Sequence, residues 1–204
     1  HLFDVFDVPN KFPTPTRSPG DVVGAVTPQG FEASGIPVGT PVCAGGHDTV
    51  LATAGACRDL RETPLYSTGT WSILVGTRDA YGATLEEKAR NIIWQRNPHD
   101  DGVLGGYNTQ AHMIGGLAFD GVRAHYAPGS SAAEVTEEAG AVAPGSEGVY
   151  INPTFVAGTG PNPAAPSAVL GWENSMPRAN AVRAVMEGLA YQTRDGLGAM
   201  SGDA

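Results

Sequence analysis

The chain has 204 residues, a net charge of −9 and 41% hydrophobic residues, which allows one large or two small folded domains and excludes a disordered protein. Its 12 basic residues are scattered, so it lacks the basic stripe that a nucleic-acid surface needs. No segment is long and apolar enough to span a membrane, and the start has no signal-peptide layout. We therefore expect a cytoplasmic protein with neither a nucleic-acid nor a membrane partner.

The 28 glycines and 16 prolines favour a mixed α/β fold with many turns over a helical bundle. The two cysteines, Cys43 and Cys57, are too few for a disulfide framework, and their spacing fits no zinc pattern. Both lie among small apolar residues. We expect two buried free thiols in a reducing compartment.

In chain order, the first half of the sequence predicts short elements joined by turns. These are a short apolar run at 22–26, a short helix or turn at 28–35, a buried strand ending at Gly45-Gly46, a helix at 49–55, and a hairpin at 63–76 with Thr68-Gly69-Thr70 at its turn.

The second half predicts mainly helices. These are a short helix at 84–90, a turn at Asp100-Asp101-Gly102, a helix over 113–126 opened by Gly115-Gly116, a surface helix at 130–139, a strand at 150–155, a loop at 156–171, and a helix at 178–200. The spacing of Ser131 and Glu134 is that of a capping box. The helix at 178–200 has the clearest apolar face.

Asp48 is the first candidate for chemistry, in the segment Gly45-Gly46-His47-Asp48-Thr49. A strand, a glycine turn and a helix start place such a side chain where the chain opens into a cleft. A carboxylate there can accept the proton of a hydroxyl nucleophile. On spacing alone, however, an Asp beside glycines is more often a turn or N-cap residue.

The turn Thr68-Gly69-Thr70 is the second candidate, because small residues let backbone amides approach phosphate oxygens. On spacing alone this turn can equally be structural. The sequence has no Gly-x-Ser-x-Gly elbow, Walker loop, His-Glu-x-x-His or Gly-x-Gly-x-x-Gly after a strand. The sequence therefore gives no support to a hydrolase, a P-loop enzyme or a dinucleotide-binding protein.

The order of these motifs resembles the FGGY carbohydrate kinases. Gly45-Gly46-His47-Asp48-Thr49 precedes Ser67-Thr68-Gly69-Thr70-Trp71-Ser72, and the segments 108–126, 153–171 and 184–190 resemble later parts of that family. The resemblance implies an α/β fold of two ribonuclease-H-like lobes of the actin and hexokinase type, with ATP and sugar in the cleft. Residues 1–60 would end the first, sugar-binding lobe, and residues 61–204 would begin the second, nucleotide-binding lobe.

The resemblance also implies roles for seven residues. Asp48 would be the general base that takes the proton of the sugar hydroxyl. His47, Asp48 and Thr49 would contact the sugar, and the nucleotide would contact Gly69, Thr70, Gly116 and Asp120. Asp120 stands where some relatives carry Gln. ATP and Mg²⁺ are the expected cofactors, with no metal ligand assigned to the protein, and a homodimer is left open.

Two family segments have no counterpart here: the Asp-x-Gly-Thr phosphate hairpin and the Gly-Gly-Gly-Ala/Gly-x-Ser segment near the adenine. We therefore expect a partial, inactive piece of a kinase. The residues around Asp48 and Gly69 are most similar to the deoxyketose kinases, fuculokinase and rhamnulokinase. Two other hypotheses stay open: a non-catalytic sugar- or nucleotide-binding remnant, and a scaffold module. Glu187 is expected to make a helix–loop hydrogen bond rather than to meet a ligand.

Overall fold

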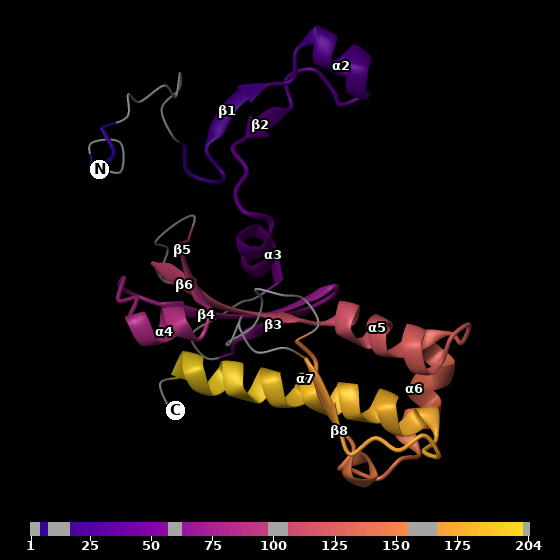
Figure 1. Ribbon diagram of the computed structural model, residues 1–204. Helices are drawn as coiled ribbons and strands as arrows, with labels where there is room; N and C mark the ends of the chain where they lie inside the picture. The colour runs from indigo at the N-terminus through magenta and orange to yellow at the C-terminus, as the bar shows by residue number, and fades with distance from the viewer. Residues whose placement is uncertain (1–4, 8–16, 57–62, 98–105, 155–166, 202–204) are drawn as a thin grey trace. The chain divides into compact units, whose positions relative to one another are not determined.

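The computed structural model describes residues 5–7, 17–56, 63–97, 106–154 and 167–201. The chain forms two compact units, 1–52 and 53–204 (Figure 1). Both helices and strands are present, so the mixed α/β class predicted from composition is confirmed. The predicted turn at Asp100-Asp101-Gly102 lies outside the described residues.

The first unit contains a two-stranded ribbon and a short helix. β1 (Val22–Ala25) pairs antiparallel with β2 (Pro41–Cys43), and α2 (Pro28–Ser34) lies in their connection. The Thr27 hydroxyl caps α2 by accepting the Gly30 N–H at 3.1 Å, and Gly35 ends the helix with φ 73°. These local signals explain why a helix forms where the sequence predicts a short helix or turn at 28–35.

The prediction of a buried strand before Gly45-Gly46 is wrong. Every residue of β1 and β2 is exposed, because a ribbon of only two strands cannot bury its own faces. Cys43 is therefore an exposed free cysteine and not the buried thiol we expected. Cys57 lies outside the described residues.

α3 (Asp48–Ala56) begins at Asp48, one residue earlier than predicted. The helix continues past Ala52, where the first unit ends. Its residues are small, with two of them, Val50 and Thr53, buried.

The second unit is built on a four-stranded antiparallel sheet in the order β3-β4-β6-β5. The strands are β3 (Leu65–Thr68), β4 (Trp71–Arg78), β5 (Ile92–Arg96) and β6 (Tyr107–Ile114). The predicted hairpin is confirmed, with Thr68 opposite Ser72 across the turn. The short helix α4 (Leu85–Ala89) precedes β5, and a capping box between Thr84 and Glu87 stabilises its N-terminus.

Strand β6 replaces the first turn of the helix predicted over 113–126. Met113 and Ile114 end the strand, and α5 (Gly116–Tyr126) begins after Gly115. The sequence of this strand does not alternate between apolar buried and polar exposed residues. Its polar residues Asn108 and Gln110 are themselves fully buried. The Gln110 amide donates to Asn108 Oδ1 at 2.9 Å and to Gln95 Oε1 of β5 at 3.0 Å, and the Asn108 amide donates to Asn97 Oδ1 at 2.8 Å.

The long helix α7 (Arg178–Ser201) organises the rest of this unit. It packs against β6, α5 and α6 (Ala132–Gly140), and against the small sheet of β7 (Tyr150–Asn152) with β8 (Ala168–Leu170). The predicted capping box of α6 is confirmed. Strand β8 lies in a segment we expected to be a loop.

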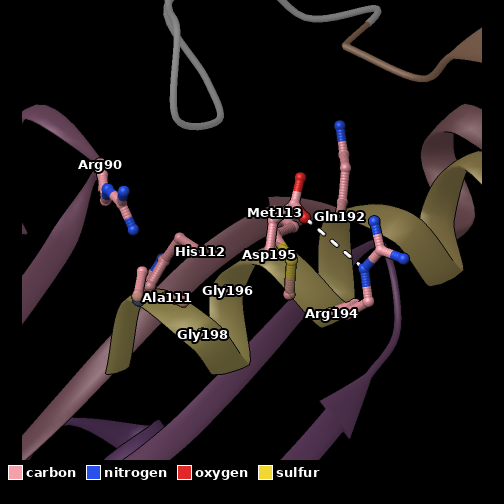
Figure 2. Close-up of a pocket in the computed structure, with 10 residues that line it drawn as sticks. Arg90, Ala111, His112, Met113, Gln192, Arg194, Asp195, Gly196 and Gly198 are labelled. Carbon is pink, nitrogen blue, oxygen red and sulfur yellow. Dashed lines mark ion pairs between the residues drawn. The ribbon is translucent and has the colours of Figure 1, made fainter. Parts of the chain in front are cut away.

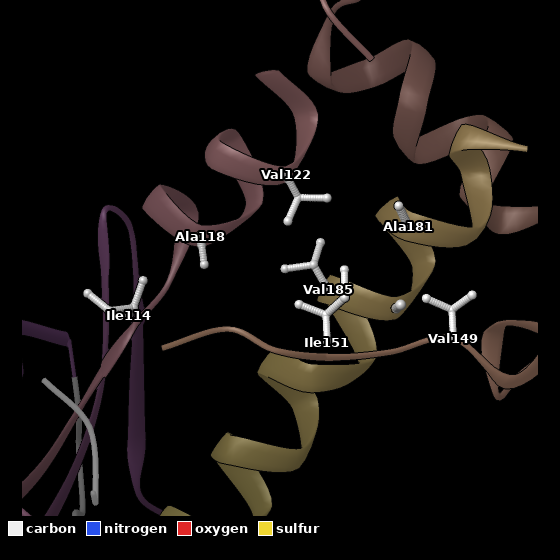
Figure 3. Close-up of a cluster of buried hydrophobic side chains, with 8 residues drawn as sticks. Ile114, Ala118, Val122, Val149, Ile151, Ala181 and Val185 are labelled. Atoms are coloured by element: carbon white, nitrogen blue, oxygen red, sulfur yellow. The ribbon is translucent and has the colours of Figure 1, made fainter. Parts of the chain in front are cut away.

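The main apolar cluster lies where α5, β7 and α7 meet (Figure 3). Val122 of α5, Ile151 of β7 and Val185 of α7 point toward one another, and all three are buried. The full cluster comprises Ile114, Ala118, Val122, Val149, Ile151, Ala181, Ala184 and Val185. Burial of these side chains is the main stabilising term for the packing of α7.

Gly188 lets α7 approach β7 more closely than any other residue could. A Cβ at this position would overlap the carbonyl oxygen of Ile151 and would lie 3.1 Å from Pro153 Cδ. A Cβ at Gly198, ten residues later on the same helix, would meet nothing within 4 Å.

These two glycines form a matched pair for a stability test. We expect Gly188→Ala to lower the free energy of unfolding by about 1–3 kcal/mol, because the added methyl group has no room. Gly198→Ala should raise it by about 0.5–1 kcal/mol, since alanine loses less backbone entropy in a helix. Urea unfolding followed by circular dichroism measures both, and equal effects of the two changes would contradict the close contact.

Candidate nucleotide pocket and candidate base

The predicted site residues fall into two groups on two units. His47, Asp48 and Thr49 belong to the first unit, and the four predicted nucleotide residues belong to the second. The candidate base and the candidate nucleotide pocket are therefore two separate sets of contacts.

Asp48 is the first residue of α3, and its side chain is 95% exposed. Only one of its two carboxylate oxygens is engaged within the described structure. The Thr49 N–H donates to Oδ1 at 2.7 Å, and His47 Nδ1 lies 3.2 Å from the same oxygen. The carboxylate is thus oriented through Oδ1, while Oδ2 is open to a proton donor.

The turn of the β3–β4 hairpin is tied to the start of α5. The Gly116 N–H donates to the Gly69 carbonyl at 2.7 Å, and the Gly115 N–H donates to the Thr70 carbonyl at 3.1 Å. These bonds satisfy helix donors that usually need a capping side chain, which α5 lacks. A Cβ on Gly116 would lie 2.9 Å from the Gly69 carbonyl oxygen, so only glycine permits this approach.

A hollow of about 520 Å³ lies beside this contact and gathers all four predicted nucleotide residues, Gly69, Thr70, Gly116 and Asp120. The other lining residues come from the hairpin, from α5 and from α7: Tyr66, Thr68, Ser72, Gly115, Leu117 and Leu189. We call this hollow the hairpin pocket. Its volume lies within the usual range of small-molecule pockets, and its lining includes the hydroxyl-bearing residues Tyr66, Thr68, Thr70 and Ser72.

Two residues of the hairpin pocket, Tyr66 and Leu189, lie outside the motifs that the sequence showed. Tyr66 lies two residues before Thr68 on β3, so the alternation of the hairpin could have indicated that both side chains share a face. Leu189 comes from α7, more than a hundred residues later, and only the tertiary structure brings it to the pocket. The Thr193 hydroxyl lies 3.1 Å from the Tyr66 hydroxyl and fastens the same helix to β3.

Asp120 is held by an arginine on its own helix. Arg123 Nη2 and Nε lie 3.0 and 3.3 Å from Asp120 Oδ1, and Arg123 Nη1 donates to the Ser130 carbonyl at 2.8 Å. The guanidinium is therefore anchored at two points. It fixes one oxygen of the carboxylate.

A second hollow of similar volume, about 520 Å³, lies between β6 and the last turns of α7 (Figure 2). Its polar lining includes Arg90, His112, Gln192, Arg194 and Asp195. Arg194 and Asp195 are 3.8 Å apart, and both side chains are mostly exposed. None of the predicted site residues lines this hollow.

Glu187 makes the predicted helix–loop hydrogen bonds. Its carboxylate accepts the Gly145 N–H at 3.0 Å and the Ser146 hydroxyl at 3.1 Å, and Arg183 Nε lies 2.7 Å away. The loop it holds contains two non-glycine residues at positive φ, Ser146 and Glu147. Such backbone costs about 1–2 kcal/mol per residue, so these bonds offset local strain.

The described residues also bear on membrane and metal binding. In the part of the chain that the structure describes, no helix has the length and apolar character that crossing a membrane requires. Within the same residues, no three His, Cys, Asp or Glu side chains gather in a way that could hold a metal ion.

The sequence profile described as "FGGY family of carbohydrate kinases, C-terminal domain" matches residues 65–204. The chain belongs to the FGGY family of carbohydrate kinases. The match begins at the first residue of β3 and includes the hairpin pocket.

Curated relatives with similar sequences are also carbohydrate kinases by name. The chain is 26% identical over 182 residues to L-fuculokinase of Escherichia coli K12, covering 87% of this chain and 36% of the relative. It is 28% identical over 204 residues to glycerol kinase of Xanthomonas campestris pv. campestris, covering 99% of this chain and 39% of the relative. The chain thus spans well under half the length of these relatives.

Solved structures show the same fold. Xylulose kinase from Rhodospirillum rubrum aligns with a TM-score of 0.76 at 21% identity, over 98% of this chain and 40% of its own. Plasmodium falciparum glycerol kinase with ADP aligns with a TM-score of 0.68 at 18% identity, over 89% and 36%. The α/β fold of FGGY sugar kinases, predicted from the motifs, is confirmed.

Glu187 provides a pH-dependent stability prediction. Burial raises the pKa of its carboxyl, but the donated hydrogen bonds, chiefly that from Arg183, outweigh burial and hold the pKa below its ordinary value. The charged form therefore favours folding. This stabilisation is present above the unfolded pKa of about 4.3 and is lost as the pH falls through the lower, folded pKa.

We expect Glu187→Gln to lower the free energy of unfolding at pH 7 by about 1–3 kcal/mol, the usual range for hydrogen bonds to a charged group. The difference from the wild type should shrink below about pH 4, where the carboxyl becomes protonated. Urea unfolding at several pH values measures it. The exposed Glu137→Gln on α6 is the control, and a Glu187 effect no larger than the control would refute the clamp.

Proposed function

We propose that the protein transfers the γ-phosphoryl group of ATP to a hydroxyl of a ketose or related sugar. The observation that supports this most is the hairpin pocket, which collects the four residues expected to meet nucleotide from two segments of a chain that belongs to a kinase family. In this reaction the sugar oxygen bonds to the γ-phosphorus as its proton leaves, and ADP departs.

Asp48 would be the general base. Its exposed carboxylate is held through Oδ1 by the Thr49 N–H, and Oδ2 is open to accept the proton of the sugar hydroxyl. His47 and Thr49, its chain neighbours, would line the sugar site. The orientation of the carboxylate supports this role, because a base must present a lone pair in a fixed direction.

The nucleotide would occupy the hairpin pocket, with its phosphates at Gly69 and Thr70 and its nucleoside along α5, past Gly116 toward Asp120. Mg²⁺ bound to the phosphates would supply charge neutralisation. Magnesium in such sites keeps several waters and uses phosphate oxygens and one or two carboxylates.

We also propose that residues 1–60 complete a sugar-binding lobe and residues 61–204 begin a nucleotide-binding lobe of a longer kinase. The support is the coverage of the relatives, 36% for L-fuculokinase and 39% for glycerol kinase. The sugar is proposed to be a deoxyketose. This rests on the motifs around Asp48 and Gly69 and on the L-fuculokinase among the relatives.

The base assignment predicts that Asp48→Asn in the intact kinase lowers kcat by about 10²–10⁴-fold, because the amide cannot take a proton. Sugar binding should persist. Coupled ADP release measures kcat, and titration calorimetry measures sugar affinity. Asp195→Asn, an exposed Asp on α7 outside the hairpin pocket, is the control. Full turnover by Asp48→Asn would exclude the role.

The lobe proposal predicts that the 204-residue chain alone releases no ADP with fuculose, rhamnulose, xylulose or glycerol. The intact protein should release ADP with one of them. Both are measured in the same assay with ATP and Mg²⁺. Sugar-dependent ADP release by the short chain would contradict the lobe proposal, and silence of the intact protein would favour a non-catalytic remnant.

A further inference from the structure

We propose that the second hollow, between β6 and the last turns of α7 (Figure 2), binds a small hydroxylated carboxylate. We call this hollow the edge pocket, because it lies beside the part of β6 that extends beyond β5. Among its described lining residues is none that we assign to the kinase reaction. The inference therefore goes beyond the proposed function and does not depend on it.

The edge pocket forms where β5 ends before β6 does. The pairing of these strands stops at Ile92 opposite Ala111, while β6 continues to Ile114. The chain enters β5 from α4 through Asn91, whose φ of 60° turns the backbone away from the line of the strand. Arg90 stands just before this turn. Figure 2 shows its side chain on a different wall of the pocket from α7.

Small residues on α7 keep the edge pocket open over an apolar floor. Gly196 lets the helix lie against the sheet, because a Cβ there would be 3.1 Å from Leu74 Cδ1 and 3.4 Å from Ala111 Cβ. Ala199 lines the pocket together with Ala111 and Met113, and all three pack in a buried apolar cluster with Leu74. The floor thus suits the C–H groups of a small organic ligand.

The charges of the lining favour a ligand with one negative charge. Arg194 and Asp195 lie 3.8 Å apart and offset each other. Arg90 keeps its charge for a ligand: within the described residues it pairs with Glu86 at 3.8 Å, and this carboxylate is 76% exposed, so the pair contributes little. The planar fork of a guanidinium matches a carboxylate. A phosphate ester carries about two charges and would exceed this balance in a chain of net charge −9.

Gln192 explains why the ligand should also carry hydroxyl groups. Gln192 Nε2 donates to Thr154 Oγ1 at 3.4 Å, whereas Oε1 is buried and has no hydrogen-bond partner within the described residues. A buried carbonyl oxygen without a donor costs free energy and is uncommon. Gln192 lines the edge pocket, and its terminal amide torsion is soft, so Oε1 can turn toward a donor there. A ligand hydroxyl is such a donor.

His112 gives the edge pocket a wall that is already in place. Its Nε2 lies 2.7 Å from Gln110 Oε1 and is the donor, because that oxygen can only accept. Gln110 in turn donates to Asn108, and Asn108 donates to Asn97. A chain of amides therefore holds the imidazole ring from behind. A wall that is fixed before the ligand arrives lowers the entropy cost of binding.

The experiment measures binding to the intact protein by titration calorimetry, without ATP or sugar. The probe is quinate, a hydroxylated cyclohexane carboxylate. Cyclohexanecarboxylate lacks the hydroxyls and myo-inositol lacks the charge, so these two are the matched probes. We expect quinate to bind more tightly than either. A fourth probe, myo-inositol phosphate, distinguishes a carboxylate site from a general anion site, and tighter binding of this ester than of quinate would overturn the choice of a carboxylate.

Two variants test the two contacts separately. Arg90→Gln should weaken the binding of quinate and of cyclohexanecarboxylate by about 10- to 100-fold, the range for hydrogen bonds to a charged group, and leave myo-inositol unchanged. Gln192→Leu should weaken quinate by about 2- to 10-fold and leave cyclohexanecarboxylate unchanged. Arg96→Gln removes an exposed arginine of β5 that does not line the pocket, and is the control for the change in net charge.

The inference is overturned if quinate does not bind, or if Arg90→Gln binds it as tightly as the wild type does. A loss in Arg96→Gln as large as that in Arg90→Gln also overturns it, because general electrostatics would then explain the binding. Circular dichroism of each variant verifies that it folds. None of the probes is a sugar proposed for the kinase reaction, so failure of sugar-dependent ADP release would refute the proposed function and leave this result standing.

Discussion

The hairpin pocket depends on one backbone contact, the pair of hydrogen bonds from the start of α5 to the turn between β3 and β4. The carbonyls of Gly69 and Thr70 accept the N–H groups of Gly116 and Gly115, so the turn caps the helix in place of a side chain. A Cβ at Gly116 would lie too close to the Gly69 carbonyl. Glycine at the helix start therefore allows the hairpin turn and α5 to lie in contact, and the hairpin pocket lies beside this contact.

Helix α7 supports this arrangement and joins the apolar core to the pocket. Val185 packs in the main cluster, Glu187 holds the strained turn at Gly145, and Leu189 lines the hairpin pocket. The three residues follow one another within a little more than one helical turn. A shift of α7 would therefore disturb core, loop and pocket together. A side chain at Gly188 would force such a shift, because its Cβ would overlap the carbonyl oxygen of Ile151 on β7.

Sequence patterns predicted the elements that short-range signals determine, and missed the features that depend on tertiary contacts. The hairpin, the capping box at Ser131 and the long helix from Arg178 each carry their own signal, and all three are confirmed. Strand β6 was missed because its buried Asn108 and Gln110 bond to each other and to β5, so the strand shows no hydrophobic pattern. The motifs named four residues of the pocket, but no local rule brings Leu189 to them. The roles of Asp48 and of the nucleotide residues stay predictions.

An acidic chain that binds a polyanion needs a source of positive potential other than basic side chains, and the described lining of the pocket has none. The N–H groups at a helix start usually meet phosphate directly. Here those of Gly115, Gly116 and Leu117 point to carbonyls of the turn. The helix would therefore act on phosphates through its dipole alone.

Direct hydrogen bonds to the phosphates would then come from the hydroxyls of Thr68, Thr70 and Ser72, which line the pocket. Magnesium would neutralise the remaining phosphate charge. A pocket of this kind holds a phosphate weakly without its metal, so nucleotide affinity should follow magnesium concentration more closely than ionic strength.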